Sequence, residues 1–363
     1  MEVKSKSSVV TNRPTGDGPS FSICIPQFNR TSFLIEACKS LCAQTFKHFE
    51  VCISDDCSTD GREAELLEFL RGSGLTFVYQ RLDRNSRYDA NLRNSIALGG
   101  GEFCFLLGND DALASPTVLE ELHREISSHP TVSVVITNYE EQGTGAAFRR
   151  MRSTGIVGSG PLVAAEMFRN FSFVSGVVLR ADEAKSLATP LWDGSEMYQM
   201  FIGCRMIASG GCLLGIDEIM VRKDVVIPGE SVDSYAARPQ QKDCAIQERI
   251  LPMGRILPLV AAAVQPYQEG ETRESTVLRV ATQLLVFTYG FWLVEFRRVQ
   301  SWRYAAGVYL GLRPRNLLNG IQLSYWRRSQ LAMLYTFIGL FGLTVPVGLF
   351  DALKKHLYAI AKA

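Results

Sequence analysis

The stretch "VCISDDCSTDG", Val51 to Gly61, carries a short apolar run into three aspartates, a hydroxyl pair and a glycine. Asp55 and Asp56 follow the run directly, and Asp60 precedes the glycine. An Asx turn that caps the next helix accounts for Asp60, which we interpret as structural. Such a turn accounts poorly for two further adjacent acids. The stretch therefore predicts a strand that delivers carboxylates to a ligand.

Strand-like and helix-like segments alternate on both sides of this stretch. Alternation at this spacing predicts right-handed βαβ units and an α/β fold with a mostly parallel central sheet. In such sheets ligands bind at the carboxyl ends of the strands, where both acidic clusters fall. The strand-like runs are FSICIPQF (21–28), FEVCIS (49–54), LTFVYQ (75–80) and EFCFLLGNDD (102–111), and the helical ones are TSFLIEACKSLCAQ (31–44), REAELLEFLRGSG (62–74) and YDANLRNSIALGGG (88–101).

Length and composition suggest one main domain with an appendage. The chain has 363 residues, of which 47% are hydrophobic and 21% charged, as in globular proteins. We expect a flexible tail over residues 1–18, an α/β domain over 19–230 and a helical region over 231–363. The nine cysteines show no paired CxxC spacing, which favours reduced thiols in a cytosolic compartment.

Charge is distributed unevenly along the chain. From Arg273 onward, twelve Lys and Arg residues face three acids, a local charge of +9 within a chain of net charge +1. The positive charge of this segment would suit a nucleic-acid partner, but the segment is also the most apolar part of the chain. That combination favours an anionic membrane surface and no nucleic acid as the partner.

Two apolar runs lie in this basic segment, VATQLLVFTYGFWLV (280–294) and SQLAMLYTFIGLFGLTVPVGLF (329–350). The second is long enough to span a bilayer, although its Gly and Pro residues suit a re-entrant or interfacial pair of helices equally well. Flanking cations and aromatic residues suit lipid headgroups. The alternative is a buried helical hairpin of a soluble domain. We expect membrane association.

The order of "ICIPQFNR", "AQTFKHFEVCISDDCSTDG", a helix rich in Asn and Arg, and "GEFCFLLGNDD" resembles the family 2 glycosyltransferases. The resemblance covers roughly Phe21 to Arg222 and is strongest in its first half. It implies the GT-A fold of nucleotide-sugar transferases and an inverting transfer from a nucleoside diphosphate sugar. In the family, the loop after the first strand touches the nucleotide, which here assigns Pro26, Phe28, Asn29 and Arg30 to donor binding. We expect Pro26 to end the strand pairing before this loop, and an ordinary turn with Thr31 as the helix N-cap is the alternative.

Further donor contacts follow from the same resemblance. It places Asp56 on the nucleotide base, where a carboxylate accepts the N3–H of a pyrimidine, with Asp55 beside it. It also suggests that Asn91 and Arg93, on the helix before the fourth strand, hold the donor phosphate or sugar. A solvated helix face explains those two residues equally well.

The sequence "GNDD" predicts a metal site. Asp110 and Asp111 emerge from five apolar residues, where unpaired anions are costly, so a cation should lie nearby. Mg²⁺ or Mn²⁺ bridging two phosphates needs only one or two carboxylates from the protein. The family motif commonly has an acid at each end, whereas Asn109 stands here. We expect Asp111 as the direct ligand and Asp110 as a contact to metal or donor sugar, and a plain turn is the alternative.

The catalytic base is sought in "LWDGSEMYQMFIGCRMIASGG" (191–211), the segment with acids ahead of a later helix. An inverting transfer needs a carboxylate near the acceptor hydroxyl. We expect Glu196 in this role first and Asp193 second. Their spacing is also that of a capping box, and the family usually has its acidic pair further along, where Gln199 stands.

These features together predict an inverting, metal-dependent glycosyltransferase on the cytoplasmic face of the bacterial inner membrane. Its acceptor would be a lipid-linked saccharide used for surface polysaccharide or O-antigen synthesis. A processive polysaccharide synthase is one alternative, although the chain lacks the QxxRW motif and the several long spans of such enzymes. A non-catalytic nucleotide-sugar-binding or scaffold protein is another. Turnover of a donor separates the enzyme from the binder.

Overall fold

The computed structural model describes residues 8–16, 18–230, 246–318, 320–321 and 323–353. The chain divides into two compact units, residues 1–239 and 240–363. The first unit is built around a sheet of eleven strands, and the second is helical.

The sheet places four parallel strands side by side. Its order is β1-β4-β3-β2-β5-β10-β7-β11-β6, with β8 on β7 and β9 on β11. Strands β4, β3, β2 and β5 run parallel, as the alternation predicted, so their carboxyl ends meet at one edge. The strands are β1 Ser8–Thr11, β2 Phe21–Gln27, β3 Phe49–Asp55, β4 Phe77–Arg81, β5 Phe103–Leu106, β6 Ala112–Leu113, β7 Val132–Glu141, β8 Ala147–Phe148, β9 Gly155–Gly158, β10 Val177–Arg180 and β11 Cys212–Lys223.

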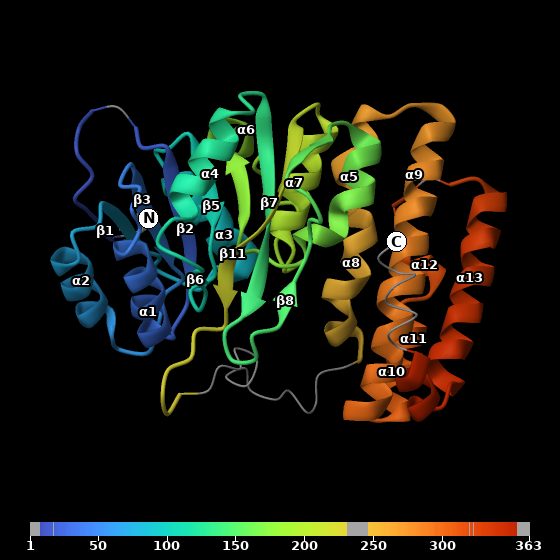
Figure 1. The fold of residues 1–363 in the computed structure, drawn as a ribbon. Helices are drawn as coiled ribbons and strands as arrows, with labels where there is room; N and C mark the ends of the chain where they lie inside the picture. The colour runs from blue at the N-terminus through green and yellow to red at the C-terminus, as the bar shows by residue number, and fades with distance from the viewer. Residues whose placement is uncertain (1–7, 17, 231–245, 319, 322, 354–363) are drawn as a thin grey trace, which may run out of the picture. The chain divides into compact units, whose positions relative to one another are not determined.

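Helices cover both faces of this sheet (Figure 1). Successive side chains of a strand point to opposite faces. Ile23 and Ile25 of β2 pack in one buried cluster with Leu34, Leu66 and Leu119 from α1, α2 and α4. On the other face, α3 contacts β2 and β3. The helices of this unit are α1 Thr31–Cys42, α2 Glu63–Gly72, α3 Arg87–Leu98, α4 Val118–Ser127, α5 Pro161–Met167, α6 Ala181–Ser186 and α7 Tyr198–Ala208.

The expected flexible tail is wrong for residues 8–16. Strand β1 pairs antiparallel with β4 and covers what would otherwise be an exposed sheet edge. Beyond β1, the Asn12 amide donates to the carbonyl of Leu75 at 2.8 Å, and Arg13 donates to Glu50 at 2.5 Å. These contacts fix the segment. Residues 1–7 and 17, also part of the expected tail, lie outside the described residues.

Two local expectations at the end of β2 also need correction. Pro26 does not end the pairing, because it stands opposite Ser54 in a β2–β3 ladder that continues to Gln27. Thr31 does not cap α1, because Arg30 occupies the N-cap position and makes no side-chain cap hydrogen bond. The Thr31 hydroxyl instead donates to Asp60 at 2.7 Å.

The second unit is a bundle of helices. A continuous helical stretch, Thr272–Val299, is long and apolar enough to cross a membrane, and 53% of its most apolar window is buried inside the protein. The second apolar run is not one straight helix, because α13 and the following helical turn, Val347–Leu353, meet at 111° across Pro346. The helices are α8 Ile246–Val264, α9 Gly270–Gln283, a π-helical segment Leu284–Tyr289, α10 Gly290–Val299, α11 Trp302–Gly311, α12 Pro314–Leu317 and α13 Tyr325–Thr344.

Helix α13 has an inner and an outer face. On the inner face, a Cβ added at Gly339 would lie 1.8 Å from the ring of Tyr309, and one added at Gly342 would lie 2.8 Å from Leu293. The two glycines therefore permit close packing on α11 and α10. We call the opposite side the outer face of α13; its exposed large apolar side chains are Trp326, Met333, Phe337 and Leu340.

Candidate active site

The loop after β2 joins the two acidic loops at the carboxyl edge of the sheet. The Asn29 backbone N–H donates to the Ser58 hydroxyl at 2.8 Å, beyond the end of β3. Arg30 donates to Asp110, beyond the end of β5, at 2.9 Å, and its guanidinium lies 4.0 Å over the ring of Phe33. Both Asn29 and Arg30 have positive φ, 53° and 56°. That conformation costs about 1–2 kcal/mol per residue, and these contacts hold it in place.

Gln27, the last residue of β2, is fully buried at the centre of this edge. Its amide accepts from Asn109 at 2.8 Å and donates to the carbonyl of Asn29 at 2.6 Å. Its backbone carbonyl accepts from Asp56 N–H at 2.8 Å and from the Asn91 amide at 3.0 Å. Gln27 was not predicted as a site residue, because a glutamine inside an apolar strand gives no signal of its partners.

The acids after β3 are held by hydrogen bonds within the protein. Asp55 accepts from Ser58 N–H at 2.7 Å and from the Tyr79 hydroxyl at 3.0 Å, one on each carboxylate oxygen. Asp56 accepts at Oδ1 from the backbone N–H and hydroxyl of Ser86, at 2.5 and 2.6 Å. Within the described part of the chain, Oδ2 of Asp56 accepts no hydrogen bond. Both carboxylate oxygens of Asp55 are therefore used in contacts within the protein, whereas Oδ2 of Asp56 remains available to accept a hydrogen bond.

The acids after β5 divide in a similar way. Both are packed over Gly108, since a Cβ there would lie 2.8 Å from Asp111 Oδ2 and 3.1 Å from Asp110 Oδ1. Asp111 is buried; its Oδ2 accepts from the Ser175 hydroxyl and its Oδ1 from Asp224 N–H at 3.0 Å. Asp110 is partly exposed and carries the ion pair with Arg30. Asp110 is thus the more accessible of the two carboxylates.

Asp110 and Asp111 both have raised pKa values, and a nearby positive charge would stabilise their ionised forms. Burial, followed by the charge of Asp110, raises the pKa of Asp111 to about 7. Burial also raises the pKa of Asp110, although Arg30 opposes the shift. Each raised pKa means that the environment disfavours the ionised carboxylate, and a bound cation would reverse that preference.

The end of β11 borders the same acids. The backbone N–H of Val225 donates to the Asp110 carbonyl at 2.7 Å, directly after the Asp224 contact to Asp111. Lys223 pairs with Asp224. Lys223 and Asp224 were not predicted as site residues, because more than 110 residues separate them from the acids that they border.

The carboxylate oxygens after β5 are suited to a divalent ion that also binds phosphate oxygens. Among the described residues, no group of three or more His, Cys, Asp or Glu side chains forms a complete protein cage. A metal that bridges a diphosphate does not require one, because the phosphates supply the remaining oxygen ligands. The carboxylate of Asp110, with raised pKa and partial exposure, is suited to this role.

The candidate base segment precedes α7 and does not form the capping box that its spacing suggests. Helix α7 begins at Tyr198, and its N-cap residue is Met197, with no side-chain cap. Asp193 forms a bidentate ion pair with Arg93, at 2.5 and 2.8 Å. Glu196 is partly exposed and has a left-handed backbone, φ 57°. Of the two acids, Asp193 is the one engaged by an arginine of α3.

Helix α3 carries the remaining predicted residues. Asn91 is buried, which excludes the solvated-face interpretation for it, and its Oδ1 has no hydrogen-bond partner among the residues that the structure describes. Arg93 points to the base segment, where it also donates to the Thr189 carbonyl at 3.2 Å. Asp89, which the sequence analysis missed, accepts from the backbone N–H groups of Glu196 and Tyr198.

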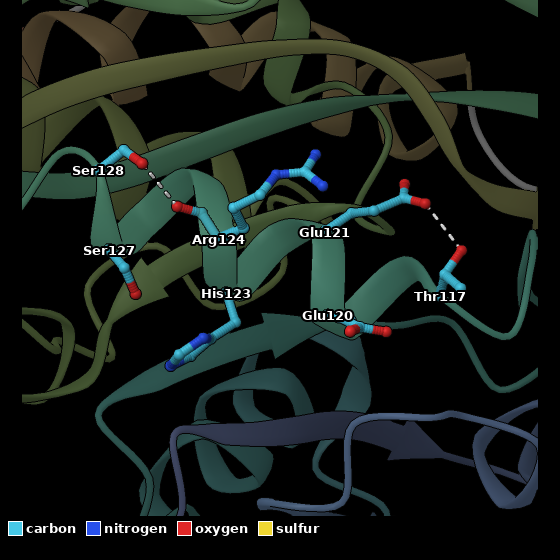
Figure 2. Close-up of a pocket in the computed structure, with 7 residues that line it drawn as sticks. All are labelled: Thr117, Glu120, Glu121, His123, Arg124, Ser127 and Ser128. Atoms are coloured by element: carbon cyan, nitrogen blue, oxygen red, sulfur yellow. Dashed lines mark hydrogen bonds between the residues drawn. The ribbon is translucent and has the colours of Figure 1, made fainter.

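A groove of about 610 Å³ lies elsewhere, along α4. Figure 2 shows its lining, which comes from one helix and its ends. Its residues are Thr117, Glu120, Glu121, His123, Arg124, Ser127 and Ser128. None of the predicted donor, metal or base residues lines it, so we do not assign the active site to this groove.

Comparisons with known proteins concern the family and the fold of the chain. The model of glycosyl transferase family 2 matches residues 22–177. Abequosyltransferase RfbV of Salmonella typhimurium is 37% identical over 100 residues, 27% of this chain and 30% of that protein. The GalNAc(5)-diNAcBac-PP-undecaprenol beta-1,3-glucosyltransferase of Campylobacter jejuni is 30% identical over 97 residues, 27% of this chain and 31% of that protein. The matches span about a third of either relative.

The fold has a match over most of the chain. The structure of Staphylococcus aureus TarS 1-349 in complex with UDP-GlcNAc superposes with a TM-score of 0.60 at 15% identity, covering 88% of this chain and 90% of that one. At that identity the likeness concerns the fold alone. The sheet, its acidic carboxyl edge and this match define the GT-A fold of nucleotide-sugar transferases. The part of the chain that matches glycosyl transferase family 2, residues 22–177, contains both acid pairs of this edge.

Proposed function

We propose that the protein transfers a sugar, with inversion, from a nucleoside diphosphate sugar to a lipid-linked saccharide in bacterial surface polysaccharide synthesis. The observation that carries the proposal is the meeting of three groups at one edge of the sheet. These are the Asp56–Ser86 contact, the Arg30–Asp110 pair and the base segment held by α3. The lipid-linked acceptor is supported by the undecaprenol-linked saccharide in the name of the Campylobacter relative.

Donor binding is divided among these groups. Asp56 accepts the N3–H of a pyrimidine base at Oδ2, while Ser86 holds Oδ1. Arg30, held over Phe33, faces the diphosphate with a planar cation. Asp55 supports the turn instead of touching the donor, because both of its oxygens already accept hydrogen bonds.

Asp110, with Asp111 behind it, would hold a divalent ion such as Mg²⁺ or Mn²⁺. When bound, the ion neutralises the charge that develops on the departing diphosphate. Asp110, and not Asp111 as expected from the sequence, is therefore the proposed direct ligand of the metal. Both carboxylate oxygens of Asp111 already accept hydrogen bonds, from the Ser175 hydroxyl and the Asp224 N–H. Asp111 then acts by holding the loop and by raising the local negative charge.

The chemical step needs a proton acceptor beside the acceptor hydroxyl. Glu196, which is partly exposed just before α7, is the proposed base, and Asp193, which pairs with Arg93, is not. Glu196 removes the proton as the hydroxyl attacks the anomeric carbon, and the diphosphate leaves from the opposite face. Arg30 stabilises the charge on the leaving group.

Membrane association would bring the enzyme to a lipid-linked acceptor. The outer face of α13 presents Trp326, Met333 and Phe337, and Arg327 and Arg328 lie at the start of the same helix. Apolar and aromatic side chains beside cations suit the interface of an anionic bilayer. We therefore place the protein on the cytoplasmic face of the inner membrane, lying on the bilayer through this face.

Turnover of a donor tests the proposed function. Purified full-length protein is incubated with UDP-, GDP-, CDP- and dTDP-sugars and a bacterial membrane lipid extract, and the released nucleoside diphosphate and glycolipid are measured. We expect one donor to be consumed only when lipid is present. A protein that binds a donor and never consumes it is the non-catalytic binder instead.

Vesicle binding tests the membrane assignment separately. Full-length protein should sediment with phosphatidylglycerol-containing vesicles and remain bound in 1 M salt, where the Debye length is about 3 Å and charge attraction alone fails. Replacing Met333 and Phe337 with Asp should release it. Leu162→Asp, an equally simple change at an exposed leucine of α5, is the matched control. Equal release of both variants would contradict the role of α13.

A further inference from the structure

Helix α3 is in contact with both sides of the proposed reaction centre. Ser86, just before its first turn, holds Asp56 on the nucleotide side. Asn91, in the second turn, donates to the carbonyl of Gln27 at 3.0 Å. Two other side chains of the same helix, Asp89 and Arg93, turn toward the segment that carries the proposed base. One helix therefore positions residues of both sites.

Asp89 makes the most direct connection to the base. Its Oδ2 accepts from the backbone N–H of Glu196 at 2.8 Å, and its Oδ1 accepts from that of Tyr198 at 2.9 Å. The Ser195 hydroxyl lies 3.4 Å from Oδ2. The carboxylate is only 1% exposed, so water does not replace these contacts. Its two oxygens thus contact three residues of the base segment, Ser195, Glu196 and Tyr198.

This arrangement differs from an ordinary helix cap. A cap is normally supplied by the N-cap side chain itself, but Met197 supplies none, and the carboxylate comes from a residue 107 positions before Glu196. Glu196 also has a φ of 57°, a left-handed backbone conformation that is unfavourable for a glutamate without stabilising contacts. Losing the Asp89 contact would let that backbone relax and would turn the Glu196 carboxylate away.

We propose that Asp89 is a positioning residue that orients Glu196 for proton removal, with Arg93 fixing the other end of the segment through Asp193. The proposal rests on the proposed function, in which Glu196 is the base. It assigns to α3 a role in catalysis that includes no contact between Asp89 and either substrate. Asp89 acts only through the backbone that it binds.

A double-mutant cycle in the full-length protein tests the proposal. The donor that the panel identifies is used with Asp89→Asn, Glu196→Gln and the double variant. Asp89→Asn keeps the size of the side chain but can accept only one of the two N–H groups well. Its kcat should fall about 10- to 100-fold, with donor KM changed less than about 2-fold, because a small misplacement of a base has that effect. The double variant should be no slower than Glu196→Gln alone.

Three results would overturn the proposal. Effects that multiply in the double variant would mean that Asp89 does not act through Glu196. A rise in donor KM with unchanged kcat would assign Asp89 to donor binding. Normal turnover by Glu196→Gln would remove the base assignment and the proposed mechanism with it, whereas a slow Glu196→Gln with multiplying effects would remove only the positioning role.

Controls separate positioning from folding. Glu50 is a fully buried carboxylate at the amino end of β3, where it accepts from Gly100 N–H at 2.6 Å and the Ser22 hydroxyl at 2.7 Å. Glu50→Gln should lower thermal stability and leave kcat unchanged. If Asp89→Asn does not fold, Ser195→Ala removes a weaker contact of the same network and should show a smaller kcat loss with the same lack of additivity. Full additivity in that pair would contradict the proposal.

Discussion

The acid pairs Asp55–Asp56 and Asp110–Asp111 follow parallel strands of one sheet and look alike in sequence, yet their surroundings differ. The first pair is held by donors from its own turn, from β4 and from the residue before α3, all within about 30 positions. The second pair depends on Arg30, Ser175 and Asp224, which come from 64 to 113 positions away. Burial raises the pKa of both acids of the second pair.

This difference indicates which acids need an external cation. Burial beside Asp110 raises the pKa of Asp111 and disfavours its ionised form, a preference that a bound cation would reverse. The difference also distinguishes the members within each pair. Asp55 and Asp111 have both oxygens engaged by the protein, while Asp56 has one oxygen that accepts no hydrogen bond from the described residues and Asp110 is partly exposed. Four substitutions test these assignments.

Asp110→Asn should have the largest effect. Loss of this carboxylate removes the accessible metal ligand, and kcat should fall by about 100- to 1,000-fold while the fold is retained. Turnover of the identified donor is measured with added Mg²⁺, with Mn²⁺ and with excess EDTA, and circular dichroism checks the fold. Wild-type activity that persists in excess EDTA would exclude the metal role of this pair.

Asp55→Ala should act on stability instead. It leaves the Tyr79 hydroxyl and the Ser58 N–H without their acceptor, and the free energy of unfolding should fall by about 2 kcal/mol. Urea denaturation measures this change, and calorimetric titration with UDP measures nucleotide affinity on the folded fraction. A large loss of UDP affinity at unchanged stability would mean that Asp55 contacts the donor nucleotide.

Asp56→Asn should weaken nucleotide binding with little change in stability. A neutral amide keeps the size of the side chain and loses the charge that strengthens a hydrogen bond to the base, so Kd should rise about 10-fold. Calorimetric titration compares the nucleoside diphosphate of the identified donor with the corresponding phosphate lacking the base. Equal weakening for both would mean that Asp56 does not read the base.

Asp111 should give the smallest effect, a pH dependence of stability in metal-free protein. Its folded pKa of about 7 lies above the unfolded value of about 3.9, so the native state binds more protons between those pH values. Stability contributed by this group is therefore lost as pH rises. From pH 6 to 7, wild type should lose about 1 kcal/mol relative to Asp111→Asn, measured by urea denaturation in EDTA. A constant difference would contradict the raised pKa.

The sequence alone was sufficient for the alternating part of the fold. Strands β2 to β5 and the helices between them were predicted, because apolar runs and helical spacing are local properties of the chain. The position of both acid pairs at strand ends was predicted for the same reason. The tail was misjudged, because pairing of β1 with β4 joins residues about 70 positions apart and leaves no local pattern.

The roles of individual residues were decided by tertiary structure. Sequence placed Asp111 ahead of Asp110 and put Arg93 beside the donor, whereas the structure buries Asp111 against Ser175 and pairs Arg93 with Asp193. Asp89 gave no signal at all. Hydrogen-bond partners and burial depend on residues distant in sequence, and these set the pKa and accessibility of each carboxylate. The sequence by itself thus determined which residue types reach the edge of the sheet, and only the folded arrangement decided which of them remain available for chemistry.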